Sequence, residues 1–331
     1  MNPTGKPVIA LFTGDPAGIG PELTARLLAA PESAARAELI LIGNRATFAE
    51  GAAAAGVADA VPPGVRVHEW ASLDAPAFAR GVVSDKNGRF MLDALTEGAR
   101  LVSSGAADAL CFAPLNKGAL RAGGMQQEDE MRWFAELLDY DGVCGELNVL
   151  ENLWTSRVTS HVPLNAVSSL LTSEKVAEAI RMITEALRAA GHANPRVAVC
   201  GLNPHNGDNG NYGDEEGRII EPGVKLAAAR GFAAAGPFSA DTVFVRALRT
   251  DGTGYDGVVT MYHDQGQIAM KLLGFERGVT VQGGLPIPIT TPAHGTAYDI
   301  AGRGVANPQA MKNAFDIACK MGQSRTLAAA H

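Results

Sequence analysis

Three histidines follow short apolar runs that have the composition of β-strands. They are His161 after 157–160, His205 after 196–201 and His263 after 257–262. Since parallel strands end at the same edge of a sheet, we expect the three imidazoles to lie at one edge. Three histidines with an open coordination position form a Lewis acid that polarises a hydroxyl or carbonyl oxygen. The placement predicts a divalent metal site, and hydrogen bonding within three separate loops is the open alternative.

Acidic and basic side chains near the same strand ends are candidates for proton transfer. Asp264 follows His263 directly and could orient it or act as an acid or base. Asp241 precedes an apolar run, where capping a helix is the alternative role. Lys117 and Lys271 stand beside a strand-end loop or an apolar run, where they could bind an anion or exchange a proton. A solvated surface position is the alternative for both lysines.

Two loops rich in small residues could approach a ligand closely. The loop 14–20 has the pattern G-x-x-x-G-x-G, which is neither the dinucleotide fingerprint nor a phosphate loop followed by Gly-Lys-Ser/Thr. Its backbone amides could hold an anion at the helix that starts near Pro21, or the loop could be only a tight turn. In the segment 292–304, Asp299 could accept hydrogen bonds from the ribose of NAD. An ordinary loop before the last helix is the alternative.

The pattern along the chain predicts a scaffold that can bring these strand ends together. Short β-branched runs alternate with longer Ala/Leu/Glu-rich segments, which is typical of an α/β fold with a largely parallel sheet. The expected strands are 7–13, 38–43, 107–113, 157–160, 196–201, 257–262 and 278–282, and the expected helices include 21–30, 88–104, 130–138, 173–190 and 308–321.

Composition limits the class of protein. The 331 residues suit two domains, since domains typically hold roughly 100–200 residues. A net charge of −7 without a Lys/Arg-rich run argues against nucleic acid or an anionic membrane as a partner. The four cysteines form no CxxC pair, and no apolar stretch approaches the ~20 residues that span a bilayer. We therefore expect a cytoplasmic protein whose partner is a small molecule.

Five segments, in order along nearly the whole chain, resemble the 4-hydroxythreonine-4-phosphate dehydrogenase family. They are 14–22 (GDPAGIGPE), 113–117 (APLNK), 203–205 (NPH), 262–266 (YHDQG) and 294–297 (HGTA). The resemblance implies an α/β fold with two α/β/α domains, mostly parallel sheets and an interdomain cleft, as in isopropylmalate and isocitrate dehydrogenases. It implies a first domain of residues 1–125 plus 295–331. The second domain, 126–294, would carry the metal ligands and the dimer interface.

The resemblance also implies cofactors and site residues. It implies NAD and a divalent metal, most often Zn2+ with Mg2+ or Mn2+ as alternatives. The metal would be shared across the interface of a homodimer. The expected roles are metal ligands at His161, His205 and His263, cofactor contacts at His294, Gly295, Thr296, Ala297 and Asp299, catalysis by Lys117, Asp241, Asp264 and Lys271, and substrate contacts at Asp15, Asn116, Arg132 and Thr280.

The substrate region departs from the family pattern. The Gly-His-Thr-Glu element of the family is replaced within 126–134, where Arg132 could contact a substrate anion or lie on a solvated helix face. The phosphate-contacting Asn and Arg of the family fall on Thr280 and Ile289, which leaves Lys271. Losing a bidentate arginine would weaken phosphate binding considerably.

These departures shape the functional expectation. We expect metal-dependent, NAD-linked oxidation of a secondary alcohol β to a carboxylate, followed by decarboxylation. The expected substrate is a non-phosphorylated diol or hydroxy acid such as a cis-dihydrodiol carboxylate. One alternative is 4-hydroxythreonine 4-phosphate or a four-carbon phospho-sugar acid as substrate. An alternative of another class is a non-catalytic small-molecule binding protein.

Overall fold

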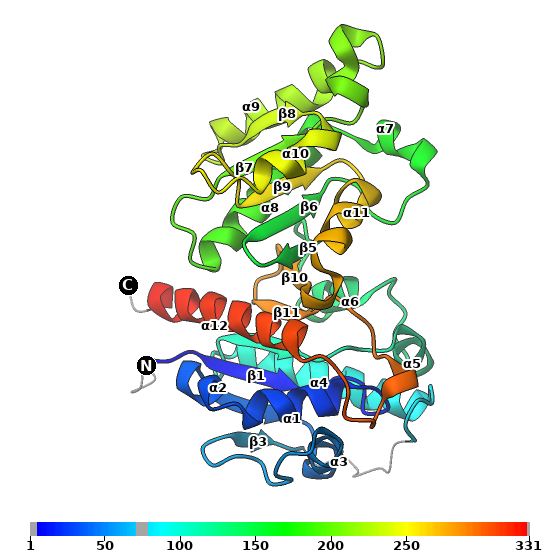
Figure 1. The fold of residues 1–331 in the computed structure, drawn as a ribbon, viewed down its shortest axis with the longest axis vertical. Helices are drawn as coiled ribbons and strands as arrows, with labels where there is room; N and C mark the ends of the chain where they lie inside the picture. The colour runs from blue at the N-terminus through cyan, green and yellow to red at the C-terminus, as the bar shows by residue number, and fades with distance from the viewer. Residues whose placement is uncertain (1–4, 71–78, 330–331) are drawn as a thin grey trace. The chain divides into compact units, whose positions relative to one another are not determined.

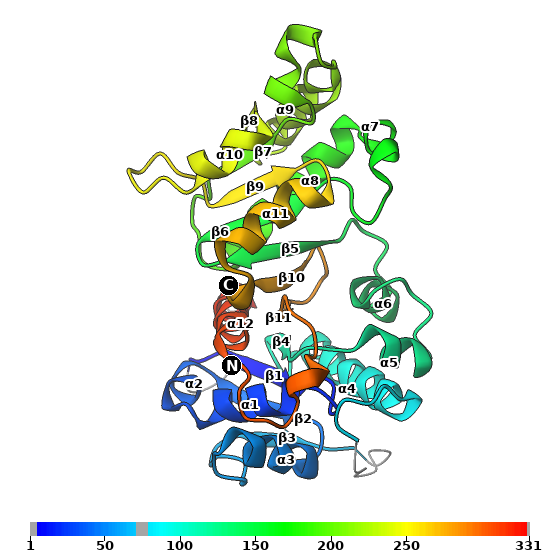
Figure 2. The same cartoon turned by 45° about the vertical axis from the view of Figure 1, so that its right-hand side comes forward.

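The chain folds into two compact units (Figures 1 and 2), and the computed structural model describes residues 5–70 and 79–329. Unit 1 comprises residues 1–142 and 279–331, and unit 2 comprises residues 143–278. In both units helices flank a mostly parallel set of strands, so the predicted α/β fold class is confirmed. The expected domain boundaries at 125/126 and 294/295 stay predictions.

Unit 1 is built around strands in the order β3-β2-β1-β4-β11-β10. These are β3 (Arg66–His68), β2 (Glu38–Ile42), β1 (Val8–Phe12), β4 (Ala109–Phe112), β11 (Ile289–Pro292) and β10 (Val279–Gly283). All neighbours run parallel except β10 and β11, which are antiparallel. The helices are α1 (Gly20–Ala29), α2 (Pro31–Arg36), α3 (Arg45–Ala55), α4 (Asp85–Ser103), α5 (Lys117–Ala122), α6 (Glu130–Leu137) and α12 (Gln309–Ala329), with a 3-10 turn η5 (Tyr298–Ile300).

Both faces of this sheet are covered, which explains the continuous apolar runs of its central strands. Successive side chains of a strand point to opposite faces. Phe12 and Ile42 pack with Phe90 of α4, whereas α12 packs on β1, β4 and β11 from the other side. There the Thr290 hydroxyl donates to the Ala314 carbonyl oxygen at 2.9 Å. The carboxyl ends of β1 and β4 lead into the loops that carry the candidate site residues Asp15 and Asn116.

Unit 2 is built around strands in the order β5-β6-β9-β7-β8. These are β5 (Gly145–Leu150), β6 (Leu153–Arg157), β9 (Gly257–Thr260), β7 (Val197–Cys200) and β8 (Ala235–Phe238). β5 and β6 form an antiparallel hairpin, and the remaining neighbours are parallel. The helices are α7 (Val167–Leu170), α8 (Ser173–Ala189), α9 (Glu221–Ala229), α10 (Ala240–Ala247) and α11 (His263–Gly274); the shorter turns are η1 (Leu164–Ala166), η2 (Pro204–Gly210), η3 (Glu216–Ile220) and η4 (Phe275–Arg277).

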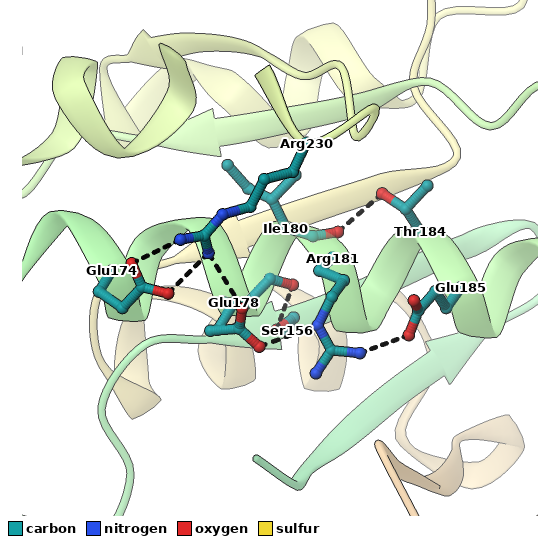
Figure 3. Close-up of polar contacts among 9 residues, drawn as sticks. Ser156, Glu174, Glu178, Ile180, Arg181, Thr184, Glu185 and Arg230 are labelled. Carbon is teal, nitrogen blue, oxygen red and sulfur yellow. Dashed lines mark hydrogen bonds and ion pairs between the residues drawn. The ribbon is translucent and has the colours of Figure 1, made fainter. Parts of the chain in front are cut away.

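Helix α8 packs on the strands β6, β7 and β9, and α10 and α11 pack on the other face of this sheet. The other side of α8 carries ion pairs (Figure 3). Arg181 bonds both Glu178 and Glu185 along the helix, and Arg230 reaches Glu174. Within residues 5–70 and 79–329, no helix combines the length and apolarity that a bilayer crossing needs.

The position of β6 corrects one expectation from the sequence. The strand predicted at 157–160 lies earlier, at Leu153–Arg157, because Trp154, Thr155 and Ser156 fill the interior of the sheet. His161 therefore follows the strand by four residues instead of directly. The strands β3, β5, β8 and β11 were not predicted.

Candidate active site

Parallel pairing of β6 and β9 brings two of the three histidines together in unit 2. The register pairs Arg157 with Thr260 at the ends of the strands. Beyond the strands, the backbone N–H and the hydroxyl of Thr159 both donate to the carbonyl oxygen of Met261, the residue that follows β9. The chain after β6 thus follows the end of β9 closely. As a result, the ring centroids of His161 and His263 are 5.9 Å apart.

The distance between the two rings is compatible with two ligands of one metal ion. Two imidazoles that share an ion through Zn–N bonds of about 2.0–2.1 Å have centroids roughly 5–6 Å apart. The Nδ1 atom of His263 lies 2.7 Å from Oδ1 of Asp264. With its proton on Nδ1, His263 donates to the carboxylate and keeps the Nε2 lone pair for a metal, as metal-binding histidines commonly do.

The third expected ligand, His205, does not join the pair. Among the side chains that the structure describes, no three or more His, Cys, Asp or Glu residues form a group that could hold a metal. His205 follows β7 and lies exposed, with its ring 6.3 Å from that of Tyr212. One chain therefore supplies two of the three expected ligands at one place.

His205 stands on an unusual backbone segment. Five consecutive residues have positive φ and form a left-handed turn: His205 (φ 52°), Asn206 (60°), Gly207 (78°), Asp208 (43°) and Asn209 (57°). A left-handed conformation costs a non-glycine residue roughly 1–2 kcal/mol, with Asn and Asp the most tolerant. Such strain persists only where the surroundings impose it, and it is concentrated at functional sites.

Glu216 holds the chain that enters this left-handed turn. Its Oε1 accepts hydrogen bonds from the backbone N–H groups of Leu202 (2.8 Å) and Asn203 (2.7 Å). Its Oε2 accepts from the side-chain amide of Asn203 at 3.0 Å. Glu216 is buried and begins a turn of π-helix, a local irregularity that is frequent at functional sites. On the far side, the Asn206 amide donates to the carbonyl oxygen of Pro237 at 2.6 Å.

The other catalytic candidates of unit 2 lie on two helices. Asp264 is in the first turn of α11, beside His263. Asp241 is exposed in the first turn of α10, whose N-cap is Ser239, so Asp241 is not the capping residue. Lys271 is exposed near the end of α11, with its ammonium 5.7 Å from the ring centre of Phe275.

In unit 1 a buried carboxylate joins two of the candidate loops. Asp15 is 0% exposed and accepts hydrogen bonds from the Ala17 N–H at 2.9 Å and from the Tyr298 hydroxyl at 2.5 Å. Burial raises the pKa of Asp15, and the bonds from Tyr298 and Ala17 oppose that rise. Burial and the neighbouring carboxylate raise the pKa of Tyr298 as well. Asp15 therefore links the loop after β1 to the segment expected to bind NAD.

Close backbone contacts hold the same loops in place. Gly14 has φ of 74°, and a Cβ there would lie 2.5 Å from the carbonyl oxygen of Ala113. The Ile19 N–H donates to the carbonyl oxygen of Thr296 at 3.0 Å, and a Cβ on Gly18 would meet the Thr296 side chain at 2.8 Å. Gly14 and Gly18 are therefore required because neighbouring loops come too close for a side chain. This close packing accounts for two of the glycines in the 14–20 pattern.

The remaining candidates of unit 1 lie around helix starts and the last loop. Asn116 caps α5 by accepting from the Ala119 N–H at 2.9 Å. Lys117, the first residue of α5, lies 3.9 Å from Glu130. Arg132 is exposed in α6. In the last loop, Nδ1 of His294 lies 3.0 Å from the Gly295 carbonyl oxygen, Ala297 has φ of 44°, and Asp299 is exposed. Thr280 lies in β10, where it pairs with Thr291 of β11.

Three residues of these sites escaped the sequence analysis. Glu216, Tyr298 and Arg157 make side-chain bonds to residues distant in sequence, and no motif marks them. The available signal is weak: an arginine at the end of an apolar strand run must find buried partners, because an unpaired buried cation is costly.

Comparisons with known proteins identify relatives over the whole chain. The family model described as "Pyridoxal phosphate biosynthetic protein PdxA" matches residues 29–318. A Pseudomonas aeruginosa protein, provisionally named 4-hydroxythreonine-4-phosphate dehydrogenase 2, is 52% identical over 98% of this chain and 100% of its own. A Bradyrhizobium diazoefficiens protein, provisionally named D-threonate 4-phosphate dehydrogenase, is 37% identical over 94% and 95%. The crystal structure of 4-hydroxythreonine-4-phosphate dehydrogenase from Klebsiella pneumoniae has a TM-score of 0.83 at 33% identity, covering 96% and 98%.

These relatives overturn the expected substrate. They are named for phosphorylated substrates, so the expectation of a non-phosphorylated dihydrodiol carboxylate and of a decarboxylating dihydrodiol dehydrogenase is wrong. The alternative with a phosphorylated substrate is the better supported one. The error has a structural reason: Ile289 is 0% exposed in β11 and pairs with Leu110 in the core, so its side chain cannot report on anion binding.

Proposed function

Because the chain belongs to the PdxA family of pyridoxal phosphate biosynthetic proteins, we propose that this dehydrogenase oxidises 4-hydroxythreonine 4-phosphate. The match to a relative of that name over 98% of the chain is the observation that carries the proposal. D-threonate 4-phosphate is a second candidate, favoured by the name of the Bradyrhizobium relative. Both compounds present a secondary alcohol near a carboxylate and a terminal phosphate.

NAD is the proposed hydride acceptor, held by the segment 294–299. The carbinol carbon gives a hydride to NAD+ and the hydroxyl gives a proton to a base, so the products are a ketone, NADH and a proton. Asp299 is exposed and could accept bonds from ribose hydroxyls, while buried Thr296 anchors the segment to the loop after β1. The hydrogen bond from the Tyr298 hydroxyl to Asp15 holds the segment 294–299 against the same loop.

His161 and His263 are the residues that would hold a divalent metal. Zn2+ is the preferred candidate ion, and Mg2+ and Mn2+ are the alternatives. Asp264 would orient His263 through Nδ1. A bound ion would polarise the substrate hydroxyl and make its proton easier to remove. His205 remains the proposed third ligand, and a homodimer that shares the site would supply it beside the pair, since one chain does not.

Lys117 is better suited to an anion contact than to proton abstraction. Lys117 is 53% exposed, and a solvated ammonium binds phosphate or carboxylate as a mobile point charge. Arg132 is exposed in the same unit and offers a planar guanidinium for bidentate contact with phosphate. Asp241 and Lys271 stay predicted acid–base candidates.

A substrate panel tests the proposal. NADH absorbance is measured with 4-hydroxythreonine 4-phosphate, D-threonate 4-phosphate and their unphosphorylated counterparts, each with added Zn2+, Mg2+ or Mn2+. We expect NADH from a phosphorylated compound only, and a His263→Ala variant should lose at least about 100-fold in kcat/KM, as expected for loss of a metal ligand. Turnover of the unphosphorylated compounds at equal or higher kcat/KM, or NADH formation by the His263→Ala variant at the wild-type rate, would contradict it.

A further inference from the structure

A buried arginine ends the strand that leads to His161. The Arg157 side chain is 8% exposed at the end of β6. Its Nη2 donates to Glu146 at 2.6 Å, its Nη1 to Oδ1 of Asn148 at 2.9 Å, and its Nε to the hydroxyl of Ser160 at 2.8 Å. Each of the three guanidinium nitrogens therefore donates a hydrogen bond, as a buried cation requires.

The bonds of Arg157 connect the two elements that carry the histidines. Ser160 immediately precedes His161, which has a left-handed φ of 44°. Asn148 accepts a second hydrogen bond, at 2.5 Å, from the amide of Gln267. Gln267 stands one helical turn after His263 on α11, on the same side of that helix.

A continuous chain of hydrogen bonds thus runs from the His161 loop to α11. From Ser160 it passes through Arg157 and Asn148 to Gln267, with β5 as its support. The strand pairing fixes where the chain leaves β6 and β9. Beyond β6, the bonds of Thr159 to the Met261 carbonyl oxygen hold the next part of the chain, and Arg157 holds the following residue, Ser160, through its hydroxyl.

We propose that Arg157 is a positioning residue, which sets the His161 loop relative to α11 so that His161 and His263 face a common point. The inference rests on the proposed metal-binding role of this pair. Arg157 does not touch the metal itself. It acts through Ser160 and Gln267, as outer partners of metal ligands do when they fix ring orientation.

Binding of Co2+ to the purified full chain tests the inference without reference to turnover. Lysine has one ammonium and cannot reach Glu146, Asn148 and Ser160 together, so Arg157→Lys should raise the Co2+ Kd about 10- to 100-fold. The visible absorption spectrum of bound Co2+ should change as well, since it reports the ligand geometry. Ser160→Ala removes a single bond and provides a milder variant; it should raise the Kd about threefold or more, in line with the loss of one hydrogen bond.

Arg181 provides the matched control. It also makes several charge-assisted bonds in unit 2, to Glu178 and Glu185, but along α8 (Figure 3). Arg181→Lys should leave the Co2+ Kd and the spectrum unchanged. His263→Ala reports on the proposed function separately, because it should abolish binding at the pair.

The outcomes separate the two ideas. If His263→Ala weakens Co2+ binding while Arg157→Lys and Ser160→Ala bind it with the wild-type Kd and spectrum, the positioning role is wrong and the metal role stands. If His263→Ala binds Co2+ as wild type does, the metal role of the pair is wrong and the positioning role falls with it. An equal rise of Kd in Arg181→Lys would also overturn the inference, since the effect would then be unspecific.

Discussion

At the scale of single residues, Asp15 shows how burial and bonding act on one carboxyl group. It is fully buried, and within residues 5–70 and 79–329 its carboxylate is bonded by an N–H and a hydroxyl and not by a cation. Burial therefore outweighs the bonds and raises the pKa of Asp15 above its ordinary value of 3.8. The family resemblance implied Asp15 as a substrate contact, but Tyr298, 283 positions away, could not be foreseen as its partner.

The raised pKa of Asp15 makes a signed prediction for stability. A carboxyl with a raised pKa in the folded state stabilises that state below the unfolded pKa, and this contribution is lost as the pH rises through the folded pKa. Asp15→Asn removes the charge and can keep both hydrogen bonds. Wild type should therefore gain free energy of unfolding relative to Asp15→Asn as the pH falls through the raised pKa of the folded state toward 3.8, by up to ~1.4 kcal/mol per pH unit between the two pKa values.

Denaturant unfolding at a series of pH values measures this difference. Tyr298→Phe serves as the companion variant, since it removes one donor to the carboxylate, raises the pKa of Asp15 further and should extend the pH dependence to higher pH. A difference between wild type and Asp15→Asn that stays constant over this pH range would show that the carboxyl does not titrate there.

At the scale of elements, the left-handed turn 205–209 depends on its neighbours for its conformation. Nothing in Pro-His-Asn-Gly-Asp-Asn predicts five successive positive φ values, although Asn, Asp and Gly tolerate them. The contacts of Glu216 and Asn206 decide the conformation. By contrast, the buried strands β1, β2, β4, β7 and β9 were predictable because each is a short apolar run, whereas the polar residues in Gly145–Leu150 concealed β5.

Glu216→Gln should loosen this turn. The amide oxygen of glutamine accepts a hydrogen bond more weakly than a carboxylate does, and the glutamine NH2 group would face the NH2 group of Asn203. The substitution should therefore cost the turn about 1.5–3 kcal/mol of hydrogen-bond free energy. Limited proteolysis followed by mass spectrometry should find faster cleavage within 203–212, together with a weaker Co2+ affinity if His205 is a ligand. Glu221→Gln is the control, because Glu221 is half exposed and pairs with Lys225 on the surface of α9. Cleavage at the wild-type rate would show that Glu216 does not hold the turn.

At the scale of the whole molecule, two observations on unit 2 point beyond a single chain. The described residues group only two of the three expected metal ligands. Helix α11, which begins at His263, and the turn η4 that follows it also expose a stripe formed by Ile268 (60% exposed), Leu272 (84%) and Phe275 (52%). Spacings of four and three residues place these side chains on one face of the helix. The fold class followed from the alternation of elements, but an assembly depends on surface shape and could enter only through the family resemblance.

A homodimer that buries the α11 stripe would place a second chain beside the histidine pair. A two-fold interface repeats the same patch on both subunits, so two charges introduced into the stripe become four in the dimer. Ile268→Glu combined with Leu272→Glu should therefore shift the protein to a monomer in sedimentation velocity experiments and weaken Co2+ binding at least about 10-fold, since His205 of the partner subunit would be lost. Val305→Glu, at a residue 64% exposed in unit 1, is the control for added surface charge. A double variant that remains dimeric would place the interface elsewhere; a monomer with the wild-type Co2+ affinity would show that each chain holds its metal alone.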